Sequence, residues 1–251
     1  FRNQWATSTQ CTNRPPVCVP LRGYHAFTAI NFDRSSGSGD DLIYGQDGND
    51  VILGQQGKDT LYGGNGDDIL IGGSNVSGAL DDDDRIDDGA GHDAISGHNA
   101  DICYRNDLYD PRMRVLAGTT LYGTDIAAGA DGRAMVTDAR QNDPTGVQQY
   151  RITLLDHADT TPDVLYGDDY IAGGAGDDEI FGQLGDDTIQ GDGSIGGDRR
   201  ADTRIIAFTD PTDVGAYRDA NNELVVRASV EAATDGDDYI EGNGGNDVIF
   251  G

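Results

Sequence analysis

The chain has 251 residues, a net charge of −28 and only 36% hydrophobic residues, and 41 of its 45 acidic residues are Asp. Binding to nucleic acid or to anionic membranes depends on Lys and Arg contacts to phosphate, so this charge excludes both as partners. The sequence has no apolar run of about 18 residues, and it therefore predicts no membrane span. It also lacks the basic-then-apolar amino terminus of a signal peptide.

Residues 1–35 are expected to form an N-terminal cap or linker. Cys11 and Cys18 enclose the short stretch TNRPPV. This spacing fits a local disulfide in an oxidising compartment, and two buried thiols are the alternative. Cys103 stands between Ile and Tyr, which is typical of a buried strand thiol. The chain starts without Met and stops within a repeat pattern, so we expect it to be part of a larger polypeptide.

A nine-residue frame with Asp at position 6 fits eleven stretches of the sequence. The copies begin at Ser36, Gly45, Gly54, Gly63, Ala79, Asp88, Val164, Gly173, Gly182, Ala233 and Gly242. Position 8 is Ile or Leu in every copy, and position 4 is Gly in every copy but one, where Asp82 replaces it. Because Asp alone sets the frame, the fixed Gly and the fixed aliphatic residue agree independently. A period this regular predicts a repeat architecture.

The residue types in the frame suit a metal-binding turn followed by a short strand. Gly at positions 1, 2 and 4 lets the backbone enter positive φ and turn its carbonyls to one side. A calcium ion takes six to eight oxygens at about 2.3–2.6 Å, which carbonyls and one short carboxylate per turn can supply. Positions 7 to 9 then form a strand whose middle residue points opposite to its neighbours. We therefore expect position 8 to face inward.

Two copies, GGNGDDILI (Gly63 to Ile71) and GGAGDDEIF (Gly173 to Phe181), match G-G-x-G-x-D-x-U-x at every specified position. The sequence therefore resembles the RTX (repeats-in-toxin) family over about 100 residues. The resemblance implies an all-β fold of right-handed parallel β-roll (β-helix) blocks, interrupted by short β-hairpin excursions. It also implies that successive turns lie on opposite edges of the roll, with each ion shared by a turn and the next turn on its own side.

The resemblance implies Ca²⁺ as the cofactor, with about four to eight ions in the chain. The side-chain ligands would be Asp41, Asp50, Asp59, Asp68, Asp84, Asp93, Asp169, Asp178, Asp187, Asp238 and Asp247. The turn positions with backbone carbonyls available to calcium would be Gly39, Gly48, Gly57, Gly66, Gly91, Gly167, Gly176, Gly185, Gly236 and Gly245.

The period divides the rest of the chain into blocks. We predict roll blocks at 36–104 and 161–196, the start of a third at 233–251, and β excursions at 105–160 and 197–232. The stretches RMRVLAGTTLYG, QQYRITLLDH and NNELVVRASV read as strands, with NDPTG and DANN as hairpin turns. Val51, Leu53, Ile69 and Ile71 form an outward aliphatic strip, which is seldom left exposed to water. We expect residues 23–32 or the first excursion to cover it.

No H-E-x-x-H, G-x-S-x-G or phosphate-binding G-x-x-x-x-G-K-S/T string occurs, so we expect no catalytic residues and no enzymatic activity in this chain. His92 and His98 are expected at plain surface positions instead of in a zinc or catalytic site. Pairs such as Asp67 and Asp68 recur from coil to coil, whereas a catalytic carboxylate pair is ordinarily singular. Ion cages are therefore favoured.

The leading hypothesis is a non-enzymatic, calcium-binding structural module of a larger secreted bacterial protein. The resemblance implies export through a type I secretion apparatus and folding on calcium outside the cell. One alternative is an adhesin, or a module that contacts glycans or cell surfaces, with the roll as its scaffold. Another is the non-catalytic tail of a secreted enzyme such as a peroxidase, protease or lipase.

Overall fold

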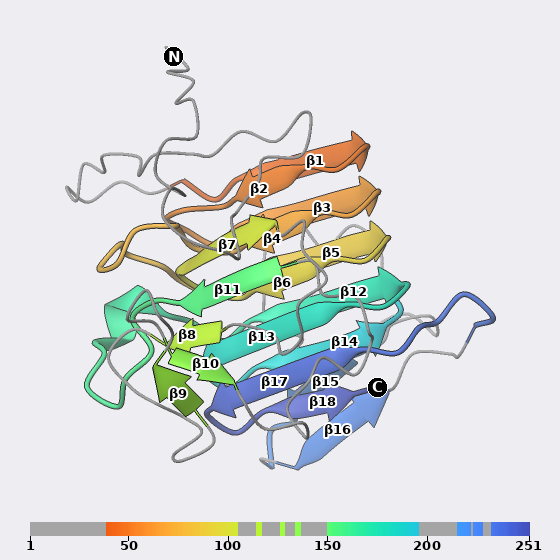
Figure 1. The fold of residues 1–251 in the computed structure, drawn as a ribbon. Helices are drawn as coiled ribbons and strands as arrows, with labels where there is room; N and C mark the ends of the chain where they lie inside the picture. The colour runs from red at the N-terminus through yellow and green to blue at the C-terminus, as the bar shows by residue number, and fades with distance from the viewer. Residues whose placement is uncertain are drawn as a thin grey trace.

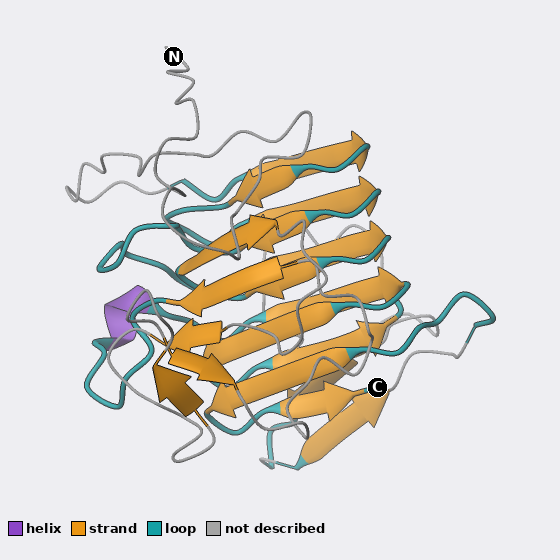
Figure 2. Cartoon of the chain, viewed as in Figure 1, coloured by secondary structure: helices purple, strands orange, loops and turns teal. Residues whose placement is uncertain are grey.

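The computed structural model describes residues 39–104, 114–116, 126–128, 134–136, 150–195, 215–221, 223–227 and 232–251. The chain winds through a stack of flattened coils that supply the strands of two parallel sheets (Figure 1). Loops and turns join the strands at both edges of the stack (Figure 2). Apart from the 3-10 helix η3 (Asp163–Leu165), the regular structure of the described residues is all strand. The fold is the all-β parallel roll that the repeats predict.

Each roll sheet takes strands from several parts of the sequence. The first roll sheet has six strands in the order β1 (Leu42–Asp47), β3 (Thr60–Asn65), β5 (Arg85–Ala90), β12 (Tyr170–Ala175), β14 (Thr188–Asp192) and β18 (Val248–Phe250). The second roll sheet has five strands in the order β2 (Val51–Leu53), β4 (Ile69–Ile71), β6 (Ala94–Ser96), β13 (Glu179–Leu184) and β17 (Tyr239–Gly244). All pairings within these two sheets are parallel.

The strand register continues across the interruptions in the repeat. Strand β5 pairs with β3 on one side and with β12 on the other, so that Ile86 is opposite both Leu61 and Ile171. Strand β14 pairs in the same way with β18, where Ile189 is opposite Ile249. Coils from the three repeat-containing stretches are therefore consecutive layers of one stack.

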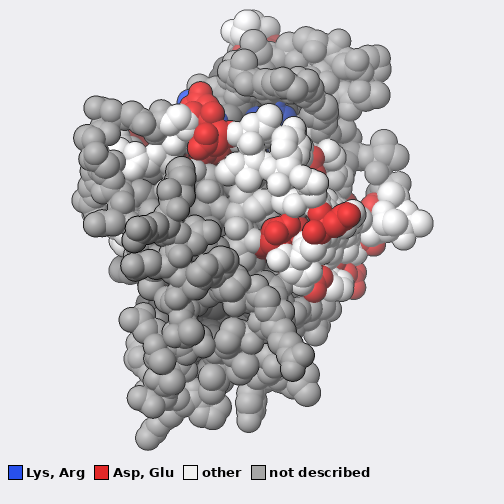
Figure 3. Space-filling model, turned by 90° about the horizontal axis from the view of Figure 1, so that it is seen from above, with Lys and Arg blue, Asp and Glu red and all other residues white. Residues whose placement is uncertain are grey.

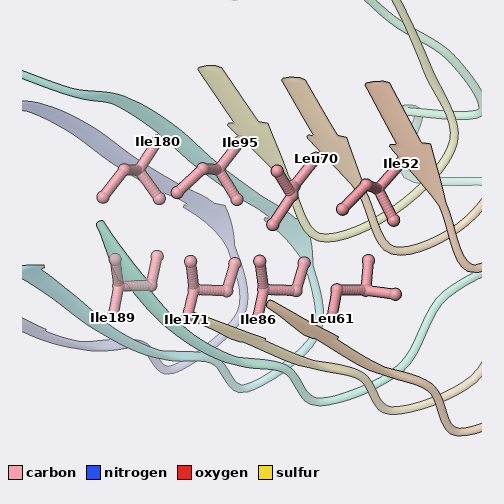
Figure 4. Close-up of a cluster of buried hydrophobic side chains, with 8 residues drawn as sticks. All are labelled: Ile52, Leu61, Leu70, Ile86, Ile95, Ile171, Ile180 and Ile189. Carbon is pink, nitrogen blue, oxygen red and sulfur yellow. The ribbon is translucent and has the colours of Figure 1, made fainter. Parts of the chain in front are cut away.

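The position 8 side chains form the core between the two sheets. Figure 4 shows them as two facing rows of aliphatic side chains, with Ile52, Leu70, Ile95 and Ile180 opposite Leu61, Ile86, Ile171 and Ile189. Ile43 and Ile240 pack against this cluster and are partly buried. The inward orientation is thus confirmed for these ten residues. Ile249 differs, with 47% of its surface exposed, because β18 is the last strand of its sheet.

A third layer covers the outer face of the second roll sheet. It is a three-stranded sheet in the order β7 (Ala100–Tyr104), β11 (Tyr150–Leu154) and β8 (Arg114–Leu116). Ile152 and Leu154 of β11 belong to one buried cluster with Ile69 and Ile71, against which Val51 and Leu53 also pack. The prediction that the first excursion covers the aliphatic strip is confirmed, because β11 lies in that excursion. Residues 23–32, the other expected cover, lie outside the described residues.

Two further strand pairs belong to the excursions. Strands β9 (Ile126–Ala128) and β10 (Ala134–Val136) are antiparallel, as are β15 (Gly215–Arg218) and β16 (Leu224–Arg227). The predicted turn DANN begins at Asp219, whose backbone N–H donates to the Glu223 carbonyl oxygen at 3.0 Å, and it joins β15 to β16. The NDPTG turn, residues 1–35 and the Cys11–Cys18 pair lie outside the described residues, whereas Cys103 lies in strand β7.

Candidate metal centre

The eleven position 6 aspartates form two ladders, one on each edge of the roll. In each ladder the backbone N–H of one Asp donates to Oδ1 of the Asp in the next coil, at 2.6 to 3.1 Å. The first ladder runs Asp41, Asp59, Asp84, Asp169, Asp187 and Asp247, and the second runs Asp50, Asp68, Asp93, Asp178 and Asp238. Successive copies therefore alternate between the two edges.

The second carboxylate oxygen of most of these residues is buried without a hydrogen-bond partner in the protein. This holds for Oδ2 of Asp50, Asp59, Asp68, Asp84, Asp93, Asp169, Asp178 and Asp187. The remaining three, Asp41, Asp238 and Asp247, lie in the first and last described coils and are more open to solvent. A buried carboxylate is costly unless a cation or a hydrogen-bond donor compensates it. The ladders thus carry rows of oxygens that are suited to a bound cation.

Backbone carbonyls face these oxygens from position 1 of neighbouring coils. A Cβ placed on Gly45 would lie 2.5 Å from the Gly63 carbonyl oxygen and 2.9 Å from Asp50 Oδ2. A Cβ on Gly173 would likewise overlap the Gly191 carbonyl oxygen and Asp178 Oδ2. Each such place is an oxygen-lined cradle between two coils, and a side chain on the glycine would fill it.

The role expected for position 1 glycine is corrected by this geometry. Positive φ occurs at position 2, including Gln46, Gln55, Gln183 and Asn243, and at position 4, but at none of the position 1 glycines. Glycine is needed at position 1 because the cradle leaves no room for a Cβ. Among the ten predicted turn glycines, positive φ is found at Gly48, Gly57, Gly66, Gly176, Gly185 and Gly245, but not at Gly39, Gly91, Gly167 or Gly236. The position 4 carbonyls face the next coil, as the Gly39 carbonyl faces Gly57.

Burial changes the protonation of the ladder carboxylates. It raises the pKa of Asp59 and Asp68 to about 6, from the ordinary value of 3.8, although hydrogen bonds from backbone N–H groups oppose the shift. Deeper burial raises the pKa of Asp178 to about 8, again against a backbone hydrogen bond. Burial disfavours the charged form of a carboxylate. A bound cation would restore that charged form.

One cradle has a third carboxylate that the repeat frame does not account for. Asp88 takes position 1, where most copies have Gly, and it is 1% exposed with no protein partner for either carboxylate oxygen. One oxygen each of Asp68, Asp88 and Asp93 lies within 4.8 Å of the others. Sequence reasoning missed Asp88, although an Asp in place of Gly at position 1 was a readable signal.

In the copy that lacks the position 4 glycine, a lysine side chain lies among the carboxylates. The ammonium group of Lys58, which is the only lysine of the sequence, lies 2.5 Å from Asp83 Oδ2 and 3.4 Å from Asp82 Oδ1. Asp82 is the residue that replaces Gly at position 4. The lysine therefore neutralises part of the excess charge in this loop.

The prediction of a surface position is wrong for His98. For His92 it agrees with the structure. The His92 side chain is 42% exposed, and its carbonyl oxygen accepts a hydrogen bond from the Tyr150 hydroxyl at 2.6 Å. His98 is 2% exposed and lies among the carboxylates of Asp81, Asp169 and Asp187. Burial by itself lowers the pKa of His98, but the carboxylates of Asp169 and Asp81 outweigh it and raise the pKa to about 10.

The oxygen donors of the ladders fit calcium, a hard cation that takes carboxylate and carbonyl oxygens. Figure 3 shows acidic side chains gathered at several places on the described surface as well, with few basic ones among them.

In the part of the chain that the structure describes, no helix has the length and the apolar composition that crossing a membrane requires.

Comparison with known proteins agrees with the donor set. The family model described as the RTX calcium-binding nonapeptide repeat matches four stretches, residues 35–61, 44–75, 164–195 and 232–251. Neither the curated proteins nor the solved structures contain a significant match to the chain. The coil with Asp84 and Asp93 lies outside the matched residues, yet both residues occupy regular places in the ladders. The roll of this chain is therefore built from RTX calcium-binding nonapeptide repeats.

Proposed function

We propose that this chain is a calcium-dependent folding module, in which Ca²⁺ bound along both edges holds the coils together. The observation that carries the proposal is the set of eight position 6 carboxylate oxygens that are buried without a hydrogen-bond partner in the protein. They recur at the same place in successive coils, beside the carbonyl oxygens of position 1. About four to eight ions would satisfy them, because an ion can be shared by neighbouring turns.

The balance of charges supports this dependence. Two carboxylates about 4 Å apart repel each other by roughly 4 kcal/mol at an effective dielectric constant of 20, and each ladder stacks several of them. A ligand that binds only the folded state adds about 2.7 kcal/mol per site at a hundredfold excess over its dissociation constant. Without calcium the ladders oppose folding, and with calcium they favour it.

The setting that suits such a module is the outside of a bacterial cell, where calcium is plentiful. The proposal includes a larger secreted parent protein and export through a type I secretion apparatus in the unfolded state. The net charge of −28 supports an unfolded state before calcium is met, because high charge and low hydrophobicity disfavour collapse. The proposal also includes the absence of catalytic activity from this chain, since its carboxylates recur as a structural series.

The test is a calcium titration of the purified chain that was first treated with chelator. Far-UV circular dichroism should change from a disordered to a β-rich spectrum, and calorimetry should count several calcium ions per chain. Magnesium at the same concentrations is the control, because it requires tighter octahedral geometry and gives up its waters reluctantly. A β-rich, protease-resistant chain in excess chelator would overturn the proposal.

A further inference from the structure

His98 occupies a metal cradle at the point where the first excursion leaves the roll. It follows Gly97, which takes the place of a position 1 glycine, because a Cβ there would overlap Asp169 Oδ2 and lie 2.7 Å from the Gly182 carbonyl oxygen. Asp169 and Asp187 are consecutive members of the first ladder. The imidazole therefore lies beside the cradle between these two coils, where the other cradles of the described roll have oxygen donors.

The two ring nitrogens of His98 face different groups. Nδ1 lies 3.0 Å from Asp81 Oδ2. Nε2 lies 3.4 Å from Asp169 Oδ2, 2.6 Å from the Leu184 carbonyl oxygen and 3.4 Å from the Gly167 backbone nitrogen. One donor atom each of His98, Asp169 and Asp187 lies within 4.8 Å of the others, and all three residues are buried.

The Asp187 carboxylate is the independent sign that a cation belongs here. Asp187 is 1% exposed, and its Oδ2 has no hydrogen-bond partner in the protein. The same is true of Oδ2 of Asp169, for which His98 Nε2 at 3.4 Å is the ion-pair neighbour. Two buried carboxylates and a carbonyl oxygen thus gather around this side of His98. Such an arrangement needs a positive charge, which either a protonated imidazole or a metal ion bound at Nε2 would supply.

The contact between Asp81 and His98 indicates which cation this is. A histidine that binds a metal usually donates its other ring N–H to a carboxylate, which fixes the tautomer and orients the ring. Asp81 is placed to accept such a bond from Nδ1, so displacement of the Nε2 proton would leave the Nε2 lone pair for the cradle. Calcium prefers oxygen ligands only, whereas imidazole suits zinc and its neighbours in the first transition row.

The spacing of the donors agrees with a small cation. Ligand atoms at about 2.0–2.1 Å from a tetrahedral zinc ion lie roughly 3.3–3.4 Å apart. The 3.4 Å between His98 Nε2 and Asp169 Oδ2 matches that separation. The Leu184 carbonyl oxygen at 2.6 Å is at hydrogen-bond distance from Nε2, so metal binding there would replace a proton shared with this carbonyl.

We propose that His98, Asp169 and Asp187 form a binding site for one transition-metal ion of the zinc class, with Asp81 as the positioning residue. At this site the ion takes the place of calcium at two of the eight ladder carboxylates, and the site rests on the proposed calcium-folded roll, because Asp169 and Asp187 come together only there. It joins residues on both sides of the first excursion, since His98 precedes that excursion and the two aspartates follow it. The chain would thus carry one nitrogen-ligated ion among several calcium ions.

The experiment titrates Co²⁺ and then Zn²⁺ into the full chain in the presence of saturating Ca²⁺. The expected result is a visible Co²⁺ absorption band that saturates at one equivalent and disappears when Zn²⁺ is added. His98→Gln should weaken this site at least about 100-fold, and Asp81→Asn should weaken it about 10- to 100-fold, as is usual for a group that orients a ligand. The matched control is His92→Gln, which should leave the band unchanged. His92 is a half-exposed histidine on the edge of the roll that carries the second ladder.

Circular dichroism with calcium reports separately whether each variant folds. If His98→Gln does not fold, histidine-labelled wild-type chain decides the question by NMR, since one equivalent of Zn²⁺ should shift Nε2 of His98. The proposal is overturned if Ca²⁺-folded wild type binds no stoichiometric Co²⁺, if folded His98→Gln keeps the band, or if His98 keeps protons on both nitrogens in excess Zn²⁺. A roll that folds without calcium would overturn the proposed function instead, and the cobalt result would still stand.

Discussion

The backbone N–H of Asp84 donates a hydrogen bond to Oδ1 of Asp169 at 2.7 Å, although 85 residues separate the two in the sequence. The same bond joins Asp41 to Asp59, which are only 18 residues apart. The first excursion is therefore inserted into the roll without breaking the ladder. Strands β7 and β11 make this possible, because their antiparallel pairing brings Tyr104 opposite Tyr150 and closes the excursion at its base.

The first prediction is that most of this excursion can be removed. Replacing residues 105–149 with Asn-Gly, which favours the two-residue type I′ hairpin turn, should connect β7 directly to β11. The deletion removes β8, but the ladder remains and β7 and β11 still cover the aliphatic strip, so we expect calcium-dependent folding with a loss of no more than about 1–2 kcal/mol. Urea unfolding in calcium measures this, and loss of the calcium-dependent spectrum would contradict it.

A larger deletion serves as the comparison for this variant. Removing residues 100–160 takes away β7 and β11 as well and exposes Ile69 and Ile71, which are now 3% and 2% exposed. Each newly exposed side chain should cost about 1.5–3 kcal/mol. The two deletions should therefore differ strongly in stability.

The second prediction concerns one ladder carboxylate. Asp178→Asn keeps an oxygen that can accept the 2.9 Å hydrogen bond from the Asp93 backbone N–H, but it removes the negative charge beside the cradle. We expect calorimetry to count about one calcium ion fewer, with a loss of about 2.7 kcal/mol at a hundredfold excess of calcium over its dissociation constant. Asp41→Asn, in the exposed first coil, is the matched control and should have a smaller effect. Equal calcium counts in wild type and Asp178→Asn would argue against the ladder as the calcium site.

The third prediction separates the two uses of glycine in the turn. A Cβ on Gly54 would overlap the Gly72 carbonyl oxygen and Asp59 Oδ2, so Gly54→Ala should lower stability by about 2–3 kcal/mol and weaken calcium binding. Its neighbour Gln55 has φ of +84°, which is unfavourable for a residue with a Cβ. Gln55→Gly should therefore stabilise the roll by up to about 1 kcal/mol. Thermal unfolding of both variants in calcium is the measurement, and similar shifts in the two would show that space at position 1 is not limiting.

The fourth prediction is a pH dependence that calcium reverses. Burial raises the pKa of Asp59 and Asp68 to about 6 and that of Asp178 to about 8, from 3.8, so the metal-free folded state binds more protons than the unfolded state between these values. Stability without calcium is thus greatest below about pH 3.8 and is lost as the pH rises towards 8.

Calcium binding requires the same carboxylates in their charged form. The pH dependence of calcium binding therefore has the opposite sign to the pH dependence of stability without calcium. The calcium concentration at the midpoint of folding should rise as the pH falls from 8 to below 6. Circular dichroism monitors calcium titrations at a series of pH values, each with a chelator-treated sample. These measurements test both the stability without calcium and the calcium concentration at the midpoint. A midpoint that does not change with pH would show that these carboxylates are not the ligands.

The sequence by itself determined the roll, the side chains of its core and the aspartates that form its two ladders. In a stack of equal coils, the neighbours in space of a residue are residues at the same position of other copies, so the period alone predicts its surroundings. That is why Leu61 and Ile171 could be assigned to the core, and Asp59 and Asp178 to the edges, before any coordinates were known.

Only the tertiary structure decided what happens where the period is interrupted. At such places a residue meets neighbours from another part of the chain, and no spacing in the sequence encodes them. His98 looked like a surface residue because its partners Asp81, Asp169 and Leu184 come from an inserted loop and from beyond an excursion. The same reason explains how Ile152 comes to cover Ile69, and why the His98 imidazole reaches one of the cradles in the described part of the roll.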